Sequence, residues 1–189
     1  MQFIKTREVK DPIRNPAENA GIDFFIPENT EDFQQAFKAK NPDAVVGDID
    51  DLHTFRDYTG RLMPDVFYNT KSGKIQIGPH CDIIIPTGIK SKFGPELALI
   101  ANNKSGVATK KKLIFGASVI DCSYQGEWHI HLINTSGNYQ FVECGTKAIQ
   151  FIPHVISTDP VEIVDQTVEE FYTEKTSRGE GWQGSTGLK

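Results

Sequence analysis

The sequence has few cysteines, no long apolar run and no excess of positive charge. Its 189 residues include three cysteines (Cys81, Cys122 and Cys144), an odd number at wide spacing. This pattern fits neither a disulfide framework nor a CxxC metal site. No stretch approaches the roughly 20 apolar residues that span a membrane, and the N-terminal residues lack the apolar core of a signal peptide. We therefore expect a cytoplasmic protein without a membrane segment.

The charge balance excludes one class of partner. The formal net charge is -5 at pH 7, whereas proteins that hold nucleic acid through its phosphates usually carry a basic surface. Stable nucleic-acid binding is therefore not expected. A small anionic substrate is compatible with this charge, because a few local cations suffice to bind it. The hydrophobic content of 38% and the chain length suit one globular domain with a sizeable core.

From about Lys74 onward, short apolar runs alternate with turn residues. In residues 127–134 apolar side chains alternate with two histidines, the period-2 signature of a half-buried strand. Residues 136–138 predict a hairpin turn, and Gly78-Pro79 predicts a break. Several short strands at this spacing indicate an all-β, jelly-roll-like barrel or sandwich. The alternating positions are Trp128, Ile130 and Leu132 against His129 and His131.

Two stretches have helical patterns. Thr30 can cap a helix through Phe37 that ends before Asn41-Pro42, because the residue before a proline disfavours helix. A second, weaker pattern covers residues 164–172. The sequence thus predicts one or two short helices beside the strands.

Two clusters of candidate metal ligands are better explained without a metal. Asp48, Asp50 and Asp51 lie close together, but their spacing lacks the glycine and the closing glutamate of an EF-hand, which favours a solvated loop. His129 and His131 share one strand face but have no cysteine or carboxylate beside them.

Polar clusters with potential chemistry interrupt the strand-like texture. Residues 103–106 follow an apolar run and offer an ammonium, a hydroxyl and exposed backbone N–H groups, which can cradle a phosphate. Residues 120–124 place a carboxylate and an aromatic ring after another apolar run. The other polar positions are Lys147 and Gln150 on a later strand, and Arg178, Ser185 and Thr186 on a glycine-rich tail.

The tail matches two nucleotide-binding patterns that its context excludes. Gly179, Gly181 and Gly184 fit the dinucleotide fingerprint, but no βαβ unit surrounds them. A P-loop interpretation lacks both the lysine and the following helix. Consecutive glycine N–H groups, two hydroxyls and an arginine can nevertheless wrap a polyphosphate.

In their order along most of the chain, these clusters resemble the five motifs of the trimeric dUTPase family (deoxyuridine 5′-triphosphate nucleotidohydrolases). The most specific match is to the third motif, from Gly116 through Ile120-Asp121 to Tyr124 and Gly126-Glu127. In the second and fourth motifs a lysine stands where the family usually has arginine. The other matches are residues 20–23 for the first motif, 104–108 for the second, 145–150 for the fourth and 178–187 for the fifth.

The resemblance implies an organisation and an activity. Residues 1–175 would form one β domain with an insertion at about 30–75, and residues 176–189 a flexible tail that closes over the active site. Active sites would be shared within a homotrimer, with the tail from a neighbouring chain. The implied reaction is Mg²⁺-assisted attack of water on the α-phosphorus of dUTP, which gives dUMP and pyrophosphate. This supplies dUMP and limits uracil incorporation into DNA. Mg²⁺ would be held by the triphosphate and waters, with no protein ligand.

The resemblance also implies a role for each candidate residue. Asp121 would deprotonate the attacking water, and Asp23 would support the metal. Tyr124 would pack under the deoxyribose, and the hairpin between Gly116 and Asp121, including Ile120, would read the uracil edge. Either Trp182 or Gln183 would cover the base. The other implied substrate-binding residues are Lys104, Ser105, Gly106, Lys147, Gln150, Arg178, Gly184, Ser185 and Thr186.

Two other functions stay open at this level. The related dCTP deaminases place a catalytic glutamate several residues after the third-motif aspartate, and this chain has His131 there. A regulatory protein of the same fold, with weak catalysis, would use the insertion to contact a protein partner. The insertion can equally be a passive elaboration, and a modified deoxyuridine triphosphate is an alternative substrate.

Overall fold

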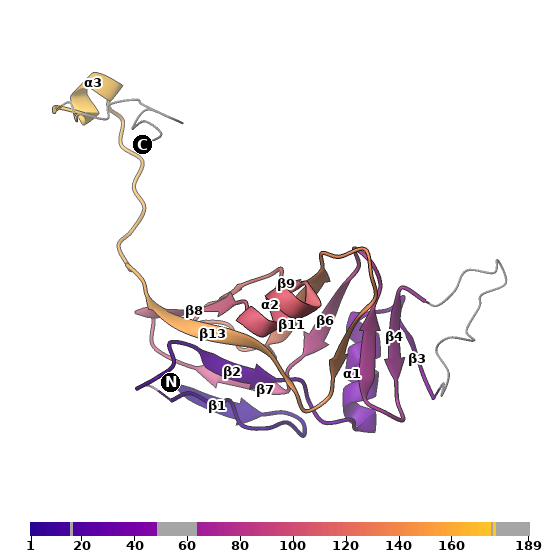
Figure 1. Cartoon of the computed structure of the whole chain (residues 1–189). Helices are drawn as coiled ribbons and strands as arrows, with labels where there is room; N and C mark the ends of the chain where they lie inside the picture. Colours follow the sequence, from indigo (N-terminus) through magenta and orange to yellow (C-terminus); the bar gives the residue numbers. More distant parts are fainter. Residues whose placement is uncertain (16, 49–63, 175, 177–189) are drawn as a thin grey trace. The chain divides into compact units, whose positions relative to one another are not determined.

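The computed structural model describes residues 1–15, 17–48, 64–174 and 176. In that part of the chain it has thirteen strands and three short helices. The chain divides into two compact units, Met1–Ser157 and Thr158–Lys189, and every described strand belongs to the first (Figure 1). The predicted all-β class is confirmed, as packed sheets rather than a closed barrel. No helix among the described residues is long and apolar enough to cross a membrane.

One four-stranded sheet carries most of the candidate site. Its strand order is β10-β8-β13-β2, and all neighbours are antiparallel. The long strand β13 therefore lies between the strand that carries Asp23 of the first motif and the strand that leads into the second motif. The four strands are β10 (Val119–Ile120), β8 (Leu97–Asn102), β13 (Lys147–Val155) and β2 (Ile22–Phe25).

Three further sheets complete the first unit. Their orders are β12-β5-β4-β3, β6-β11-β9 and β1-β7, and only the β3–β4 pair is parallel among the described strands. The strands are β12 (Gln140–Glu143), β5 (Lys74–Ile77), β4 (Val66–Asn69), β3 (Val45–Gly47), β6 (Asp82–Pro86), β11 (His129–Asn134), β9 (Leu113–Phe115), β1 (Gln2–Lys5) and β7 (Ile89–Lys92).

The predicted alternation in β11 is confirmed. Trp128, Ile130 and Leu132 are buried, while His129 and His131 are half-buried on the other face. The predicted break is confirmed too, because β5 ends immediately before Gly78-Pro79. The local pattern therefore identified both the strand and the end of its neighbour.

The predicted hairpin at residues 136–138 is wrong. β11 pairs with β6 and β9, whereas β12 pairs with β5 in another sheet. The buried amide of Asn134 holds the connection from β11 to β12, which lie in different sheets. Its Nδ2 donates to the carbonyls of Gly78 at 2.8 Å and Asn138 at 2.7 Å. A turn sequence alone cannot tell a hairpin from a connection between sheets, because the partner strand is distant in sequence.

The first helix, α1 (Glu31–Lys40), begins and ends as the sequence predicts. The hydroxyl of Thr30 accepts a hydrogen bond from Phe33 N at 3.3 Å, which satisfies one of the free N–H groups of the first turn. Phe33 and Phe37 are buried, with ring centroids 5.7 and 5.3 Å from that of Tyr68. These aromatic contacts attach α1 to β4, and Figure 1 shows α1 beside β3 and β4, away from β8 and β13.

The other two helices differ from the sequence expectation. α3 (Val168–Phe171) falls within the predicted stretch 164–172 but is shorter. α2 (Ser105–Lys111) begins where the sequence indicates only a turn, and it ends at Lys112 in the left-handed conformation with φ 54°. The seven residues of α2 include one glycine and two β-branched side chains, which lower helix propensity and hide the pattern.

The acidic segment at residues 30–75 contains more regular structure than its composition suggests. It includes α1, β3 and β4 and the start of β5. Asp48 is exposed, while Asp50 and Asp51 lie outside the described residues. That this segment is an insertion stays a prediction, as does a domain boundary at residue 175.

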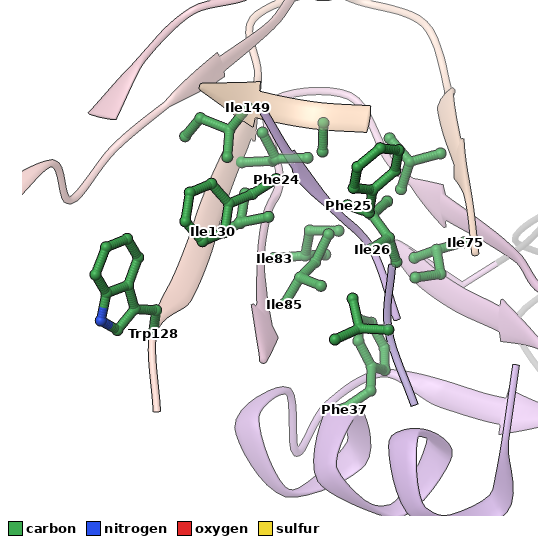
Figure 2. Close-up of a cluster of buried hydrophobic side chains, with 14 of the residues drawn as sticks. Phe24, Phe25, Ile26, Phe37, Ile75, Ile83, Ile85, Trp128, Ile130 and Ile149 are labelled. Carbon is green, nitrogen blue, oxygen red and sulfur yellow. The ribbon is translucent and has the colours of Figure 1, made fainter. Parts of the chain in front are cut away.

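Aromatic rings and isoleucines form the core between the sheets (Figure 2). Phe24 of β2 stacks on Trp128, with ring centroids 5.0 Å apart, and Phe151 of β13 lies 5.1 and 4.9 Å from these two rings. Each fully buried side chain of this size contributes about 2–3 kcal/mol. The core thus fixes β2 and β13. Asp23 and Gln150, which directly precede Phe24 and Phe151 on these strands, are only half-buried.

Candidate active site

Three strands bring polar residues to one face of the β10-β8-β13-β2 sheet. Asp23 on β2 lies opposite Gln150 on β13, and Gln150 lies opposite Asn102 on β8. Directly opposite residues share a face, and successive residues alternate between faces. Phe24 and Phe151 therefore point into the core while their polar neighbours point away from it.

The carboxylate of Asp23 holds two ammonium groups. Its Oδ2 lies 2.8 Å from Lys147 Nζ, and its Oδ1 forms a short ion pair with Lys104 Nζ. Burial raises the pKa of Asp23, but hydrogen bonds and positive charge from both lysines outweigh burial and hold this pKa below its ordinary value. Asp23 is therefore ionised at neutral pH. We call Asp23, Lys104, Lys147 and Gln150 the charged cluster.

Further positive charge gathers beside Lys147. Its ammonium lies 5.7 Å from the centroid of the Phe25 ring, and Lys10 Nζ lies 5.6 Å from the same centroid. Lys10 Nζ also donates to the carbonyl of Gly145 at 2.7 Å. Cations near an aromatic face are attracted by its quadrupole, so Phe25 helps to hold both ammonium groups at this end of β13.

Backbone groups hold the amide of the charged cluster. Gln150 Nε2 donates to Asn103 O at 3.0 Å. A Cβ at Gly21 would come within 2.6 Å of Gln150 Oε1, so a larger residue there would push this amide aside. Asn103 Oδ1 accepts from Phe115 N at 3.1 Å. Asn103 thus links β8 to β9, a role that its place in a polar turn does not reveal.

The second-motif residues lie at the start of α2. Lys104 is the N-cap, but its side chain makes no cap hydrogen bond and turns to Asp23 instead. Ser105 is exposed, and its carbonyl accepts from Thr109 Oγ1 at 2.6 Å. Nothing lies within 4 Å of a Cβ built at Gly106, so close packing does not explain the glycine there.

Asp121 and Tyr124 lie in the loop after β10, residues 121–127, which we call the aspartate loop. Tyr124 N donates to Asp121 O at 3.1 Å, and the Tyr124 hydroxyl donates to Glu127 O at 2.9 Å. A Cβ at Gly126 would lie 2.3 Å from that hydroxyl oxygen, so glycine makes space for the ring. The loop is compact, and the side chains of Asp121 and Tyr124 are exposed.

A buried arginine anchors the aspartate loop. Arg7 Nε and Nη2 donate to the two carboxylate oxygens of Glu127 at 3.0 and 2.6 Å, and Nη1 reaches Asp32 Oδ2 on α1 at 2.5 Å. The hydrogen bond with Glu127 outweighs burial and raises the pKa of Arg7. The sequence does not indicate this pairing, because 120 positions separate Arg7 from Glu127.

The segment between β9 and β10 is fixed by β11 and β8. Gly116 N donates to His131 O at 3.0 Å, and Ala117 N donates to His131 Nδ1 at 3.2 Å. Ile120 pairs with Leu99 on β8 and is half-buried. We call residues 116–120 the base hairpin, after the role that the sequence predicts for it.

The charged cluster and the aspartate loop lie toward different ends of β8. Gln150 is opposite Asn102, whereas Ile120 is opposite Leu99, and the antiparallel chain moves farther from the cluster as it enters Asp121. With about 3.3 Å per residue and about 4.8 Å between strands, the two sets of side chains are on the order of 20 Å apart in one chain. The structure therefore assembles the charged cluster but does not join it to Asp121 within a single copy.

A family model matches most of the sequence. The dUTPase model covers residues 67–187. The chain belongs to the dUTPase family. The match includes the second to fifth motifs, and Asp23 of the first lies before it.

Curated dUTPases share about a third of their residues with the chain over the matched region. The deoxyuridine 5′-triphosphate nucleotidohydrolase of Legionella pneumophila (strain Paris) is 35% identical over 121 residues, which covers 61% of this chain and 74% of that protein. The enzyme of that name from Oryza sativa subsp. japonica is 34% identical over 116 residues, covering 61% and 60% respectively.

Solved dUTPase structures share the fold at low sequence identity. A mutant dUTPase of Staphylococcus bacteriophage 80alpha with dUpNHpp has a TM-score of 0.66 and 17% identity, covering 99% of this chain and 98% of that chain. A mutant dUTPase from phage phi11 of S. aureus, described with a structural Mg(II) ion, has a TM-score of 0.59 and 16% identity, covering 89% and 97%. These likenesses establish the family's fold for this chain.

Part of the predicted dUTPase site lies outside the described residues. These positions are Arg178, Trp182, Gln183, Gly184, Ser185 and Thr186. In the described part of the chain, no group of three or more His, Cys, Asp or Glu side chains could hold a metal ion. The roles of the individual site residues stay predictions.

Proposed function

We propose that the chain hydrolyses dUTP to dUMP and pyrophosphate. The observation that carries this proposal is the charged cluster on the face of a dUTPase fold, where Asp23 holds the ammonium groups of Lys104 and Lys147. The curated relatives named above are deoxyuridine 5′-triphosphate nucleotidohydrolases. The reaction supplies dUMP and limits the uracil available for incorporation into DNA.

The charged cluster suits the triphosphate. A phosphate oxygen that takes the place of the Asp23 carboxylate beside either ammonium group forms a charge-assisted hydrogen bond of the same kind. Lysine keeps the charge of the usual arginine but lacks its planar fork, so each contact is a point contact. Fixed charges of this type act by positioning the substrate and by stabilising the phosphoryl transition state.

Asp121 is the proposed general base. It removes a proton from water, whose oxygen forms a bond to the α-phosphorus while the bond from that phosphorus to the bridging oxygen breaks and pyrophosphate leaves. Within the described residues, the Asp121 side chain forms no hydrogen bond or ion pair, so its oxygens are accessible to water. Tyr124 packs under the deoxyribose, and its exposed ring is held by the hydroxyl bond to Glu127.

The base hairpin is proposed to read uracil through backbone groups. The backbone N–H groups of Gly116 and Ala117 donate to His131 and so hold the hairpin, which fixes the direction of its other backbone groups. Backbone groups fixed in direction can distinguish bases by their pattern of donors and acceptors. A rigid, narrow hairpin also leaves little room for the methyl group of thymine.

The complete site is proposed to form between copies in a homotrimer. Hydrolysis needs the base and the phosphate ligands around one α-phosphorus, and one chain holds them on the order of 20 Å apart. Beside the charged cluster, on the same sheet face, Val119, Ile100 and Ile152 lie directly opposite one another. Val119 is 56% exposed, and such an apolar row favours contact with another copy.

The C-terminal unit also suits contact with a second copy. Val161 and Ile163 are 97% and 95% exposed. Removal of such apolar side chains from water is favourable. We propose that this segment packs on a neighbouring chain. Its tail would then bring Arg178, Ser185 and Thr186 over the phosphates, with Trp182 or Gln183 over the base.

Mg²⁺ fits this site as a companion of the triphosphate. Asp23 supplies an ionised carboxylate, but both of its oxygens are held by lysines. Magnesium usually keeps several waters and binds through one or two carboxylates plus substrate phosphates, so Asp23 is the residue that would hold it, through water. When bound, the ion would neutralise charge on the phosphates.

Pyrophosphate release tests this proposal. Wild type and Asp121→Asn would be assayed with dUTP, dTTP, dCTP and UTP in the presence of Mg²⁺, and dCTP reactions would also be assayed for ammonia. We expect turnover of dUTP by wild type, little turnover of the other three, and no ammonia. Absence of dUTP turnover by pure wild type would overturn the proposal, and ammonia from dCTP would support the deaminase alternative.

A further inference from the structure

We propose that His131 is a positioning residue for base recognition: its side chain holds the base hairpin in the conformation that reads uracil. The inference rests on the proposed function, in which this hairpin reads the base. His131 is on β11, a strand that carries no residue of the charged cluster. Motif comparison places His131 at the position of the deaminase glutamate and gives it no role in binding dUTP.

The side chain of His131 makes a contact that only some residues can make. Its carbonyl accepts from Gly116 N at 3.0 Å, a backbone bond that any residue at this position can form. Its Nδ1 accepts from Ala117 N at 3.2 Å, which requires a side-chain acceptor. The hairpin is therefore held at two successive N–H groups, one through the backbone and one through the imidazole.

The opposite ring nitrogen selects the tautomer that this contact needs. His131 Nε2 lies 2.8 Å from Asp82 Oδ2 on β6. A carboxylate can only accept, so the proton lies on Nε2, and Nδ1 keeps its lone pair for Ala117. Asp82 thus supports the hairpin through the imidazole.

Gly116 and His131 match each other in shape. A Cβ at Gly116 would lie 2.1 Å from His131 Nδ1, so no larger residue fits while the imidazole is in place. Glycine leaves the backbone of a hairpin with more conformational freedom than other residues do. The contacts to His131 restrict that freedom at the point where the proposed function needs a fixed direction for backbone groups.

Loss of the hydrogen bond between His131 and the base hairpin should affect base recognition. Uracil offers the O4 acceptor where cytosine offers the N4 donor, so correct pairing depends on the orientation of the hairpin backbone. The proposed general base, Asp121, follows Ile120, whose pairing with β8 does not involve His131. A loosened hairpin should therefore raise KM and weaken the preference for dUTP over dCTP, with little effect on kcat.

Two substitutions separate the proposed contact from general packing. His131→Asn places Oδ1 where Nδ1 was and keeps the acceptor for Ala117. His131→Gln reaches toward Asp82 but leaves no acceptor at the Nδ1 position. The matched control is His129→Asn, two residues earlier on the same face of β11, where Nε2 has no hydrogen-bond partner in the described structure.

We expect His131→Gln to raise KM for dUTP about five- to tenfold, with kcat within about twofold of wild type. The ratio of kcat/KM for dUTP to that for dCTP should fall by a similar factor, because a site built on hydrogen bonds loses selectivity when these are misplaced. His131→Asn should restore most of the KM and of the ratio, and His129→Asn should match wild type. Amide exchange at Ala117 should be faster in His131→Gln alone.

Several outcomes would overturn the inference. An unchanged KM in His131→Gln would do so, as would equal losses in the Asn and Gln variants or a fall in kcat rather than a rise in KM, since these indicate no role or a merely structural one. An unchanged exchange rate at Ala117 in His131→Gln would show that the hydrogen bond does not restrain the hairpin. Absence of dUTP turnover by wild type would instead overturn the proposed function, and this inference with it.

Discussion

The charged cluster and the aspartate loop place a carboxylate by different means. Asp23 is on a regular strand, 16% exposed, between two ammonium groups, whereas Asp121 is exposed in a loop shaped by backbone hydrogen bonds. A carboxylate whose pKa is lowered by cations is a weak base. Asp23 is therefore suited to holding the two ammonium groups in place, and Asp121 is the carboxylate suited to removing a proton from water.

The two regions also differ in what holds them. The charged cluster depends on ion pairs among its own members. The aspartate loop depends on Glu127, which Arg7 holds from a distant part of the chain. Substitutions in the first region should therefore change substrate binding and local stability together, while substitution of Asp121 should change chemistry alone.

Deletion of residues 178–189 should have the largest effect, because it removes the proposed phosphate lid while both regions stay intact. We expect turnover to fall by about a thousandfold or more, the scale seen when an arginine that stabilises a phosphoryl transition state is lost. Pyrophosphate release would be measured beside sedimentation or light scattering. An intact trimer is expected, and its loss would mean that the tail is structural.

Asp121→Asn should come next. We expect kcat to fall by about a hundredfold to a thousandfold, within the usual contribution of a general base, with KM for dUTP nearly unchanged. The exposed position of Asp121 predicts that the free energy of unfolding stays within about 0.5 kcal/mol of wild type. Steady-state kinetics and urea unfolding check both points, and full activity of this variant would contradict the proposed mechanism.

Asp23→Asn should show the opposite profile. Loss of the carboxylate leaves two ammonium groups without their partner, so we expect a free energy of unfolding lower by about 1–2 kcal/mol at pH 7. Because the folded pKa of Asp23 lies below its ordinary 3.8, this stabilisation is present above pH 3.8 and is lost as the pH falls through the folded pKa. Urea unfolding of both proteins from pH 7 to pH 3 should therefore show their difference shrinking only at the acidic end. A constant difference would contradict the ion-pair explanation.

Replacing the lysines by the family's usual arginine should have the smallest effect. Asp23 can pair with either cation, and arginine restores a planar fork for phosphate oxygens. We expect Lys104→Arg and Lys147→Arg each to lower KM for dUTP by no more than about threefold. A large rise in KM would show that the cluster is shaped for lysine.

The sequence predicted those features that depend on neighbouring residues. The cap at Thr30 and the spacing of Phe33 and Phe37 identified α1, and alternation identified β11. The hairpin at residues 136–138 was wrong because the strand partners depend on contacts of Asn134 with distant carbonyls. Helix α2 has too weak a propensity to be read from its pattern.

The candidate site likewise has residues that the sequence predicted and residues that only the fold reveals. Motif order was enough to name Asp23, Lys104 and Lys147, which the structure brings together. The residues that support the site, such as Arg7 and His131, meet their partners only through the fold, so no local pattern reveals them. The separation of the two regions along β8 likewise required the strand register.

Complementation between two inactive variants tests most directly whether the two regions of different copies make one site. Asp121→Asn and the double variant Lys104→Met, Lys147→Met would be co-expressed, and mixed trimers purified through two different tags. If each site takes the charged cluster from one copy and the aspartate loop from another, the mixed trimers should have about a third of the wild-type sites, because one of the three interfaces in each mixed trimer joins an intact cluster to an intact loop. If both regions serve the same site within one chain, every site keeps one damaged half, and the mixed trimers would stay as inactive as either parent.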